Sequence, residues 1–186
     1  MSAVLITGMS GAGKSTIAGV LARRGLVSID ADNDPWLART VDSAGVPVAE
    51  EPAAPDLDWL ARHSWAWNPA RLDELIQAAA PGTLYVCGGA ANEIELADRF
   101  AHLILLELDE PTMLERLDAP TRDNEWGRIG DTREDLRRRR QAYQDRLRAH
   151  GAIVIDASQP LDQVVDAILS HTLPRSAAGQ FGPQAR

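Results

Sequence analysis

Cysteine and lysine are almost absent from the sequence. Cys87 is the only cysteine among 186 residues, which rules out a disulfide within the chain and is typical of a reducing compartment. Lys14 is the only lysine, whereas arginine occurs 18 times. A bias toward arginine has therefore left lysine at one position, where a compact ammonium group is not replaceable by a planar guanidinium. This makes Lys14 a candidate functional residue.

Long apolar runs and net positive charge are also absent. No run of about 18 apolar residues occurs, and no basic segment precedes the first apolar residues, so we expect neither a membrane span nor a signal peptide. The formal net charge of −8 argues against general binding to nucleic acids or membrane surfaces. We therefore expect a cytoplasmic protein without nucleic-acid or membrane partners, and no obligate protein partner is evident.

A phosphate-binding motif is present near the N-terminus. Residues 8–15 read G-x-x-x-x-G-K-S, between an apolar run at residues 3–7 and a helical pattern at 16–24. In a strand, turn and helix, backbone N–H groups and the helix dipole point at one place, which suits a polyphosphate. The motif predicts that Lys14 reaches the β- and γ-phosphates and that the Ser15 hydroxyl ligates Mg²⁺. The residues expected to bind the nucleotide are Gly8, Ser10, Gly11, Ala12, Gly13, Lys14, Ser15 and Thr16.

Apolar runs and helical patterns alternate along the chain. This alternation indicates an α/β fold with a parallel sheet flanked by helices, in one domain over residues 1–173. Residues 174–186 are small and polar and are expected to form a disordered tail. The five predicted strands lie at residues 3–7, 26–29, 83–87, 102–108 and 152–155.

Residues 33–80 interrupt this alternation and form a predicted substrate-binding lobe. Asp34-Pro35 has the pattern of an N-cap followed by proline at the first helical position, which predicts a helix over residues 35–44. Residues 45–56 are rich in proline and predict a surface loop, after which two further helices are expected. The inserted lobe is therefore expected to be helical.

Three candidate segments directly follow predicted strands. They are the phosphate-binding loop, Asp30-Ala31-Asp32 and Gly88-Gly89. Ligands of doubly wound parallel sheets bind outside the C-terminal ends of the strands. We therefore expect these segments to converge on one active site at the same edge of the sheet.

Four of the five tryptophans lie in the predicted lobe. Tryptophan most often packs into a core, but this concentration beside the candidate site also suits stacking on a flat ring. Trp36 is the preferred candidate for a substrate contact because it follows Asp32 closely in the sequence, whereas His63 and Cys87 are interpreted as structural. The four tryptophans are Trp36, Trp59, Trp65 and Trp67.

With these residues in place, the chain resembles the P-loop small-molecule and nucleotide kinases, and among them most closely the shikimate kinases. The resemblance covers residues 3 to about 171. It implies a five-stranded sheet in the order 2-3-1-4-5, ATP and Mg²⁺ as cofactors, and phosphoryl transfer to a small-molecule acceptor. Asp30-Ala31-Asp32 matches the family's D-x-D motif, which implies that Asp30 helps to hold magnesium and that Asp32 binds the acceptor hydroxyl and acts as its base.

The same resemblance implies the remaining ligand contacts. Gly88 and Gly89 match a glycine pair whose backbone approaches the substrate. Arg116 matches an arginine that stacks on adenine, and Ser158 lies in a loop expected to pass over the adenine. Arg139 falls where the family has a substrate-binding arginine, although it belongs to a run of four arginines that cannot all face one ligand on a helix.

A lid is expected at residues 118–131. Lid closure excludes water, which would otherwise receive the phosphoryl group. Arg122 and Arg128 flank the polar part of this segment, and either could lie over the phosphates. The candidate catalytic residues are therefore Lys14, Asp32, Arg122 and Arg128.

Three functions are compatible with these features. The first is an ATP-dependent kinase of a small hydroxylated metabolite, and the second is a nucleoside or nucleoside-monophosphate kinase, which the aromatic lobe and arginines also suit. The third is a regulatory P-loop NTPase without a small acceptor, but the sequence has no N-K-x-D motif and no D-x-x-G after the third predicted strand. The lobe and the lid differ from the shikimate kinase pattern, so the acceptor is not predicted.

Overall fold

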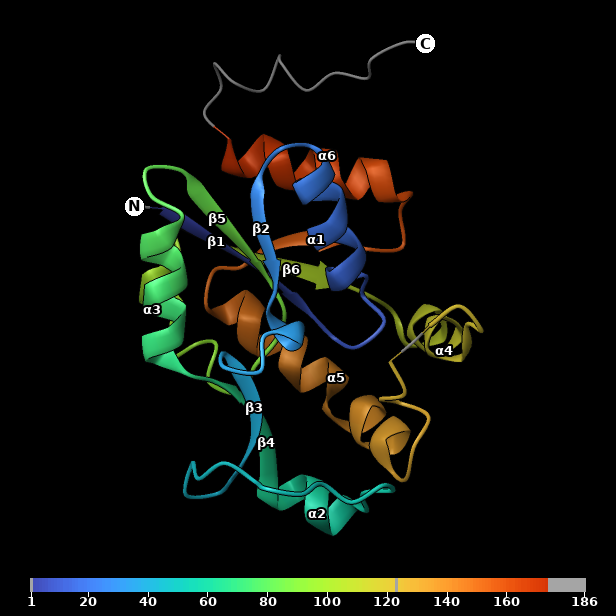
Figure 1. Ribbon diagram of the computed structural model, residues 1–186. Coiled ribbons are helices and arrows are strands. Elements are labelled where there is room, and N and C mark those ends of the chain that lie inside the picture. The colour runs from blue at the N-terminus through green and yellow to red at the C-terminus, as the bar shows by residue number, and fades with distance from the viewer. Residues whose placement is uncertain (1, 123, 174–186) are drawn as a thin grey trace.

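The computed structural model describes residues 2–122 and 124–173 (Figure 1). Its central sheet has five parallel strands: β1 (Ser2–Gly8), β2 (Val27–Asp30), β5 (Thr83–Cys87), β6 (His102–Glu107) and β7 (Ile153–Asp156). The strand order is β2-β5-β1-β6-β7. Numbered within this sheet alone, that order is 2-3-1-4-5, as the resemblance implies. The tail predicted at residues 174–186 lies outside the described residues.

Helices cover both faces of the sheet, with α1 (Lys14–Arg23) and α6 (Leu161–Thr172) on one face and α3 (Pro69–Ala78) and α5 (Thr132–Ala149) on the other. Alternate residues of β1 point to opposite faces. Val4 and Ile6 pack with the core of α1 and α6, whereas Ala3 and Leu5 pack on the side of α3. Burial of each of Val4, Leu5 and Ile6 contributes about 1.5–3 kcal/mol to folding, so the central strand anchors both cores.

The inserted lobe is not wholly helical, and the helix predicted over residues 35–44 is wrong. This segment holds strand β3 (Ala38–Asp42), which pairs antiparallel with β4 (His63–Trp67). Asp34 accepts hydrogen bonds from the backbone N–H groups of Trp36 and Leu37, which closes a turn where a helix was expected. The cross-strand pairs, Thr40 opposite Trp65 among them, then hold the chain extended.

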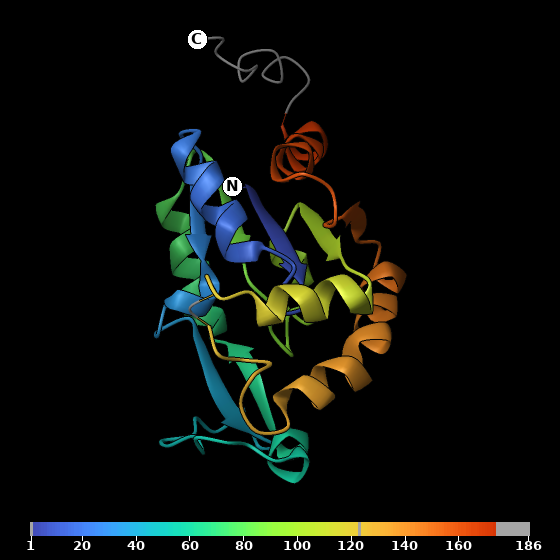
Figure 2. The same ribbon diagram turned by 90° about the vertical axis from the view of Figure 1, so that its right-hand side faces the viewer.

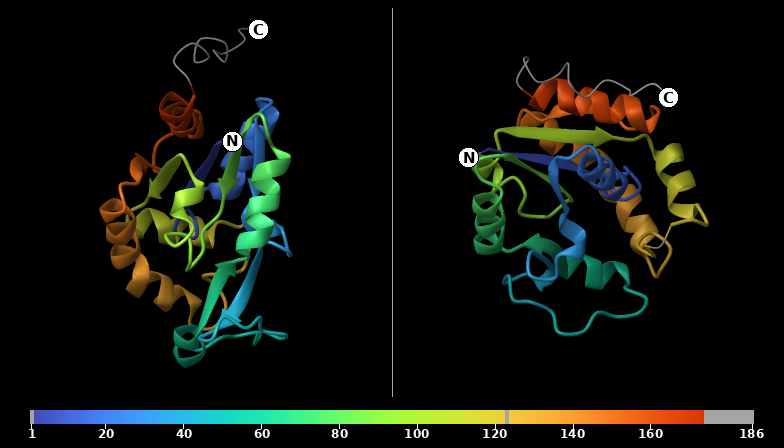
Figure 3. Two further views of the ribbon diagram at one scale, coloured as in Figure 1. Left: turned by 90° about the vertical axis from the view of Figure 1, so that its left-hand side faces the viewer. Right: turned by 45° about the horizontal axis from the view of Figure 1, so that its top comes forward.

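Two helices of the lobe agree with the sequence. They are α2 (Leu57–Arg62), capped by Asp56, and α3, capped by Asn68 with proline in its first turn. The hairpin of β3 and β4, together with α2, extends beyond the sheet and faces the N-terminal half of α5 (Figures 2 and 3).

The remaining elements are short. They are α4 (Glu110–Asp118) and the 3-10 turns η1 (Ala31–Asn33) and η2 (Ala97–Arg99). Residues 119–122 and 124–131, between α4 and α5, belong to no helix or strand and correspond to the described part of the predicted lid. Across residues 2–122 and 124–173, no helix has the length and apolar character that crossing a bilayer requires.

Candidate active site

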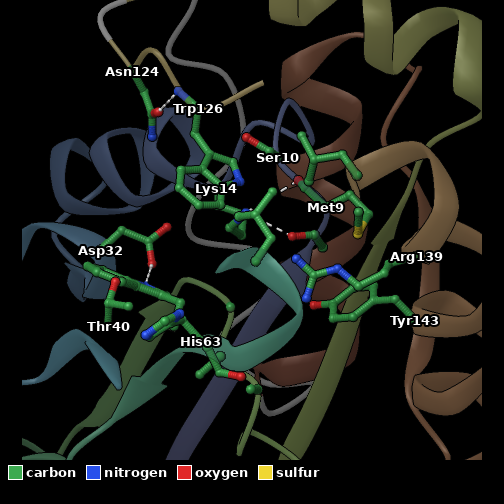
Figure 4. Close-up of a pocket in the computed structure, with 18 of the residues that line it drawn as sticks. Met9, Ser10, Lys14, Asp32, Thr40, His63, Asn124, Trp126, Arg139 and Tyr143 are labelled. Atoms are coloured by element: carbon green, nitrogen blue, oxygen red, sulfur yellow. Dashed lines mark hydrogen bonds between the residues drawn. The ribbon is translucent and has the colours of Figure 1, made fainter. Parts of the chain in front are cut away.

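A cavity of about 550 Å³ lies at the C-terminal edge of the sheet (Figure 4). Its walls come from the phosphate-binding loop, the hairpin with α2, the lid and α5. Lys14, Asp32, Gly89 and Arg139 all line it, although they are far apart in the sequence. The predicted convergence of the loop, the D-x-D segment and the glycine pair on one edge therefore holds in the structure.

The phosphate-binding loop has the backbone geometry that an anion requires. Gly11 and Gly13 have φ values of 89° and 91°, which favour glycine. Gly13 is the N-cap of α1, and within the described part of the chain no side chain caps this helix end. The first backbone N–H groups of α1 are thus available to a phosphate. Lys14 Nζ lies over the same loop, donating to the carbonyls of Gly8 (2.8 Å) and Met9 (3.3 Å).

The two acidic residues of the D-x-D segment have different surroundings. Asp30 stabilises the η1 turn, since its carboxylate accepts from Asp32 N (3.2 Å) and Asn33 Nδ2 (3.1 Å), and it does not line the cavity. Asp32 lines the cavity and accepts a hydrogen bond from Trp65 Nε1 at 3.0 Å. Asp32 is therefore the member of the pair whose side chain is available to a ligand in the cavity.

A metal ion would need ligands beyond acidic side chains here. Among residues 2–122 and 124–173, no group of three or more His, Cys, Asp and Glu side chains could hold a metal. The exposed Ser15 lies in the first turn of α1, next to Lys14. A magnesium at this point would rely on the Ser15 hydroxyl and on phosphate oxygens, as in other P-loop proteins.

Only one of the two adjacent glycines faces the cavity. Gly89 lines it, and a Cβ there would lie 3.2 Å from Thr7 Oγ1 and 3.5 Å from the Tyr143 hydroxyl. Gly88 is buried, and a Cβ there would lie 2.7 Å from Ala31 Cβ and 3.0 Å from the Trp67 ring. Gly88 therefore allows close packing of the η1 turn, while Gly89 leaves backbone open to the cavity.

The structure distinguishes the two lid arginines. Arg122 donates to Ser10 Oγ in the phosphate-binding loop (2.8 Å) and to the carbonyl of Trp126 (2.8 Å). Burial lowers its pKa, and the neighbouring charge of Arg128 lowers it further. Arg128 is exposed and binds the lid backbone instead, at the carbonyls of Arg122 and Asn124. Arg122 is thus the lid arginine next to the phosphate-binding loop.

Arg116 and Ser158 lie beside the phosphate-binding loop but outside the cavity lining. Arg116 donates to the carbonyls of Gly11 (3.4 Å) and Ala157 (2.8 Å) and so joins this loop to the segment after β7. The Ser158 backbone N–H and hydroxyl both bond to Asp156 Oδ1. Arg116 therefore contacts the residue before Ser158, in the region where the resemblance expects adenine.

One member of the four-arginine run reaches the cavity. Arg139 lines it and pairs with Asp135 one turn earlier. Arg137 pairs with Glu110, and Arg138 pairs with Glu134, away from the cavity. The remaining arginine, Arg140, binds the carbonyl of Leu108.

The tryptophans are placed differently from the prediction. Trp36 is 70% exposed and lies outside the cavity, and Trp67 belongs to the core. Trp59 and Trp65 line the cavity, as does Trp126 of the lid. Trp36 lies on the outer side of the turn that Asp34 closes, so its closeness to Asp32 in sequence does not bring it to the site.

His63 was interpreted as structural, yet it lines the cavity. Its ring stacks on Trp59, with centroids 4.2 Å apart and planes 18° apart. Nδ1 lies 2.7 Å from the Trp59 carbonyl, an acceptor, so Nδ1 carries the hydrogen, and no hydrogen bond from the described residues reaches Nε2. The spacing of four residues between Trp59 and His63 is the sequence signal for this contact, since it is about one helical turn and His63 directly follows the last residue of α2.

Glu93 is a buried acidic residue that sequence reasoning did not single out. Its Oε2 accepts from Thr7 Oγ1 (2.7 Å), Ala90 N (3.3 Å) and the Tyr143 hydroxyl (3.4 Å), while Oε1 lies 3.6 Å from Arg146 Nη2. Burial raises the pKa of Glu93, and it raises the pKa of Tyr143 well above its ordinary value. Tyr143 and Arg146 line the cavity, so this carboxylate supports its α5 wall from below.

Replacing Glu93 by glutamine is expected to change the pH dependence of stability. The folded pKa of Glu93 is raised, so the native protein binds more protons than the unfolded chain, and stability falls as pH rises through the folded pKa. Glutamine does not titrate, so the Glu93→Gln variant lacks this dependence of stability on pH. The free energy of unfolding of Glu93→Gln relative to the unmodified protein should therefore increase from pH 5 to pH 8 in urea titrations. A constant difference across this range would contradict the assignment, and Glu95→Gln serves as the control.

The fold and the site together define the class of protein to which this chain belongs. A phosphate-binding loop at the C-terminal edge of a parallel sheet in the order β2-β5-β1-β6-β7 is the P-loop kinase fold. A family model described as an AAA domain matches residues 4–140. The chain belongs to this family, and the matched region includes the phosphate-binding loop, Asp32, both glycines and the lid.

The similarity to known proteins extends over nearly the whole chain. Shikimate kinase 2 of Sodalis glossinidius (strain morsitans) is 29% identical over 187 residues, 94% of this chain and 98% of that protein. A sugar kinase structure from Janibacter sp. HTCC2649 matches with a TM-score of 0.56 at 21% identity, over 96% of this chain and 98% of that one. The structure of a deoxyadenosine kinase from M. mycoides with bound dATP matches with a TM-score of 0.54 at 19% identity, over 92% of this chain and 98% of that one.

Proposed function

We propose that this protein is an ATP- and Mg²⁺-dependent kinase that phosphorylates a hydroxyl group of a small metabolite. The observation that carries the proposal is that the phosphate-binding loop and Asp32 line one cavity. Such a cavity can hold a phosphoryl donor at one end and an acceptor at the other. The shikimate kinase that is 29% identical, and the structural likeness to kinases, support this reading.

At the donor end, the chain supplies positive charge and hydrogen-bond donors. The uncapped N-terminus of α1, Lys14 and Arg122 converge there. ATP would supply the phosphoryl group when bound, and Mg²⁺, which the Ser15 hydroxyl would help to hold, would add positive charge. Phosphoryl transfer depends mainly on positioning and on neutralising charge, so these residues are the expected source of rate enhancement.

At the acceptor end, Asp32 takes the proton of the acceptor hydroxyl. The acceptor oxygen forms a bond to phosphorus, the bond between phosphorus and the bridging oxygen breaks, and ADP leaves with its electron pair. Gly89 and Arg139 line the same part of the cavity and contact the acceptor in this proposal. The lid lies over the cavity through Asn124 and Trp126 and limits access of water.

A specific observation favours a second candidate, a nucleoside or nucleoside-monophosphate kinase. Trp59, Trp65 and Trp126 line the cavity, and aromatic faces of this kind suit a flat base. The deoxyadenosine kinase of M. mycoides shares the fold. A regulatory NTPase without an acceptor is less favoured because the cavity continues past the phosphate-binding loop to the lobe and α5.

A screen for ADP release tests the proposal. Purified protein with ATP and Mg²⁺ is given shikimate, gluconate, other sugars and cyclitol acids, deoxyadenosine and other nucleosides, or nucleoside monophosphates in turn. One class is expected to raise ADP formation well above the rate with water alone. If no acceptor did so while ATP bound and was slowly hydrolysed, the kinase proposal would be wrong and the regulatory NTPase favoured.

A further inference from the structure

Trp65 joins three segments that form the acceptor end of the cavity. In the hairpin it pairs with Thr40 of β3. Its carbonyl accepts from Ala91 N at 2.8 Å, which ties β4 to the segment after Gly89. Its indole Nε1 donates to Asp32 Oδ1 at 3.0 Å, the bond drawn as a dashed line at Asp32 in Figure 4. The backbone of Trp65 is thus fixed on two sides, and its side chain is directed at Asp32.

The hydrogen bond from Trp65 engages one carboxylate oxygen of Asp32 and leaves the other oxygen unbonded among the described residues. Oδ1 accepts from Trp65, whereas within the described residues no hydrogen bond reaches Oδ2. The last side-chain torsion of aspartate is soft, so an unrestrained carboxylate would rotate. The two carboxylate oxygens are equivalent, and the indole N–H therefore fixes the orientation of the group, with one oxygen bonded to Trp65 and the other left available.

The indole is a suitable donor for this purpose because it is neutral. An arginine or lysine at the same place would offset the negative charge of the carboxylate and weaken it as a base. The Trp65 ring is 37% exposed, unlike the core residue Trp67 at 2%. Trp65 is therefore not a core residue. Its backbone is fixed in the hairpin, and the bond from its indole to Asp32 explains why a tryptophan lies at this position.

We propose that Trp65 is a positioning residue. Its indole N–H holds Asp32 Oδ1 so that Oδ2 faces the acceptor hydroxyl. This inference rests on the proposed kinase function, in which Asp32 is the base. It adds a residue from the inserted hairpin, which the D-x-D segment alone does not indicate.

The first test observes the hydrogen bond without an acceptor. In the ¹⁵N-labelled protein, the indole N–H signal of Trp65 is identified by its loss in Trp65→Phe. Asp32→Asn and Asp32→Ala are expected to shift this signal, with the larger shift in Asp32→Ala. The Trp59 signal, identified through Trp59→Phe, is the control and should change less. A Trp65 signal that stays in place in both Asp32 variants would overturn the proposal.

The second test separates positioning from binding, with shikimate, gluconate and deoxyadenosine as acceptors. Trp65→Phe keeps an aromatic ring on β4 and loses the N–H. It is expected to lower kcat about tenfold or more, because a misplaced group can reduce the rate by on the order of 100-fold, with acceptor KM changed less than about threefold. Trp59→Phe, at the same cavity but without a bond to Asp32, should alter KM alone.

The outcomes separate the two proposals. A raised KM with unchanged kcat in Trp65→Phe would make Trp65 only a wall of the cavity and would overturn its positioning role. In Asp32→Asn, adding Trp65→Phe should lower kcat no further, and an additional tenfold loss would also count against it. If none of the three acceptors raised ADP release above water, the kinase function would fail for them, while the indole signal would still decide whether Trp65 holds Asp32.

Discussion

Replacing Lys14 by alanine is expected to lower the rate of ATP-dependent phosphoryl transfer by about 100- to 1,000-fold. This is the size of effect that follows when a preorganised donor to a developing negative charge is removed. Lys14 Nζ lies at the phosphate-binding loop, within 2.8 Å of the Gly8 carbonyl, so its charge is placed where the β- and γ-phosphates belong. The measurement is kcat in the ADP-release assay with the best acceptor of the screen.

Two controls accompany this substitution. Lys14→Arg keeps the charge but replaces a point charge by a planar fork, so it should recover only a small part of the activity. The free energy of unfolding of Lys14→Ala should stay close to that of the unmodified protein, because among the described residues Lys14 bonds only to two backbone carbonyls of its own loop. A folded Lys14→Ala variant with normal turnover would refute the assignment of this loop to phosphate binding.

Replacing Asp32 by asparagine is expected to lower kcat by about 100- to 10,000-fold, the usual contribution of a positioned general base. ATP should bind as before, because the Asp32 side chain bonds to Trp65 and not to the phosphate-binding loop. Asparagine has nearly the same shape, so the hairpin should keep its place. The Kd for a fluorescent ATP analogue and kcat for the acceptor, measured on the same preparation, separate the two effects.

Glu51→Gln is the matched control for Asp32→Asn. Glu51 is a second acidic residue of the cavity, and its carboxylate accepts from Thr40 Oγ1 at 2.5 Å. We expect it to affect acceptor KM at most. If both substitutions reduced kcat equally, the loss would reflect the overall charge of the cavity, and Asp32 would have no separate role as the base.

Much of the fold could be predicted because its signals are local. The apolar runs of the five sheet strands and the glycine pattern of the phosphate-binding loop are each contained in a short segment. The segment at residues 35–44 failed for the opposite reason. Asp34-Pro35 has the local signal of a helix start, but pairing of Thr40 with Trp65, 25 residues further on, decides in favour of a strand.

The candidate site shows the same division. Residues whose role depends on backbone shape, such as Gly11 and Gly13, could be predicted from the motif alone. Which of Arg122 and Arg128 reaches the phosphate-binding loop depends on the path of an irregular lid, which no short sequence pattern encodes. Trp36 was preferred for its closeness in sequence, although the turn at Asp34 directs it away from the cavity.

The lone lysine has a practical consequence for chemistry on this protein. A reagent that acylates lysine side chains has one target in the whole chain, and that target lies in the wall of the cavity. Acetylation there removes the positive charge, so one covalent event is sufficient to inactivate the donor end. A protease that cleaves only after lysine likewise has one bond to cut, between Lys14 and Ser15 in the first turn of α1. If the proposed function holds, bound nucleotide should slow cleavage of that bond.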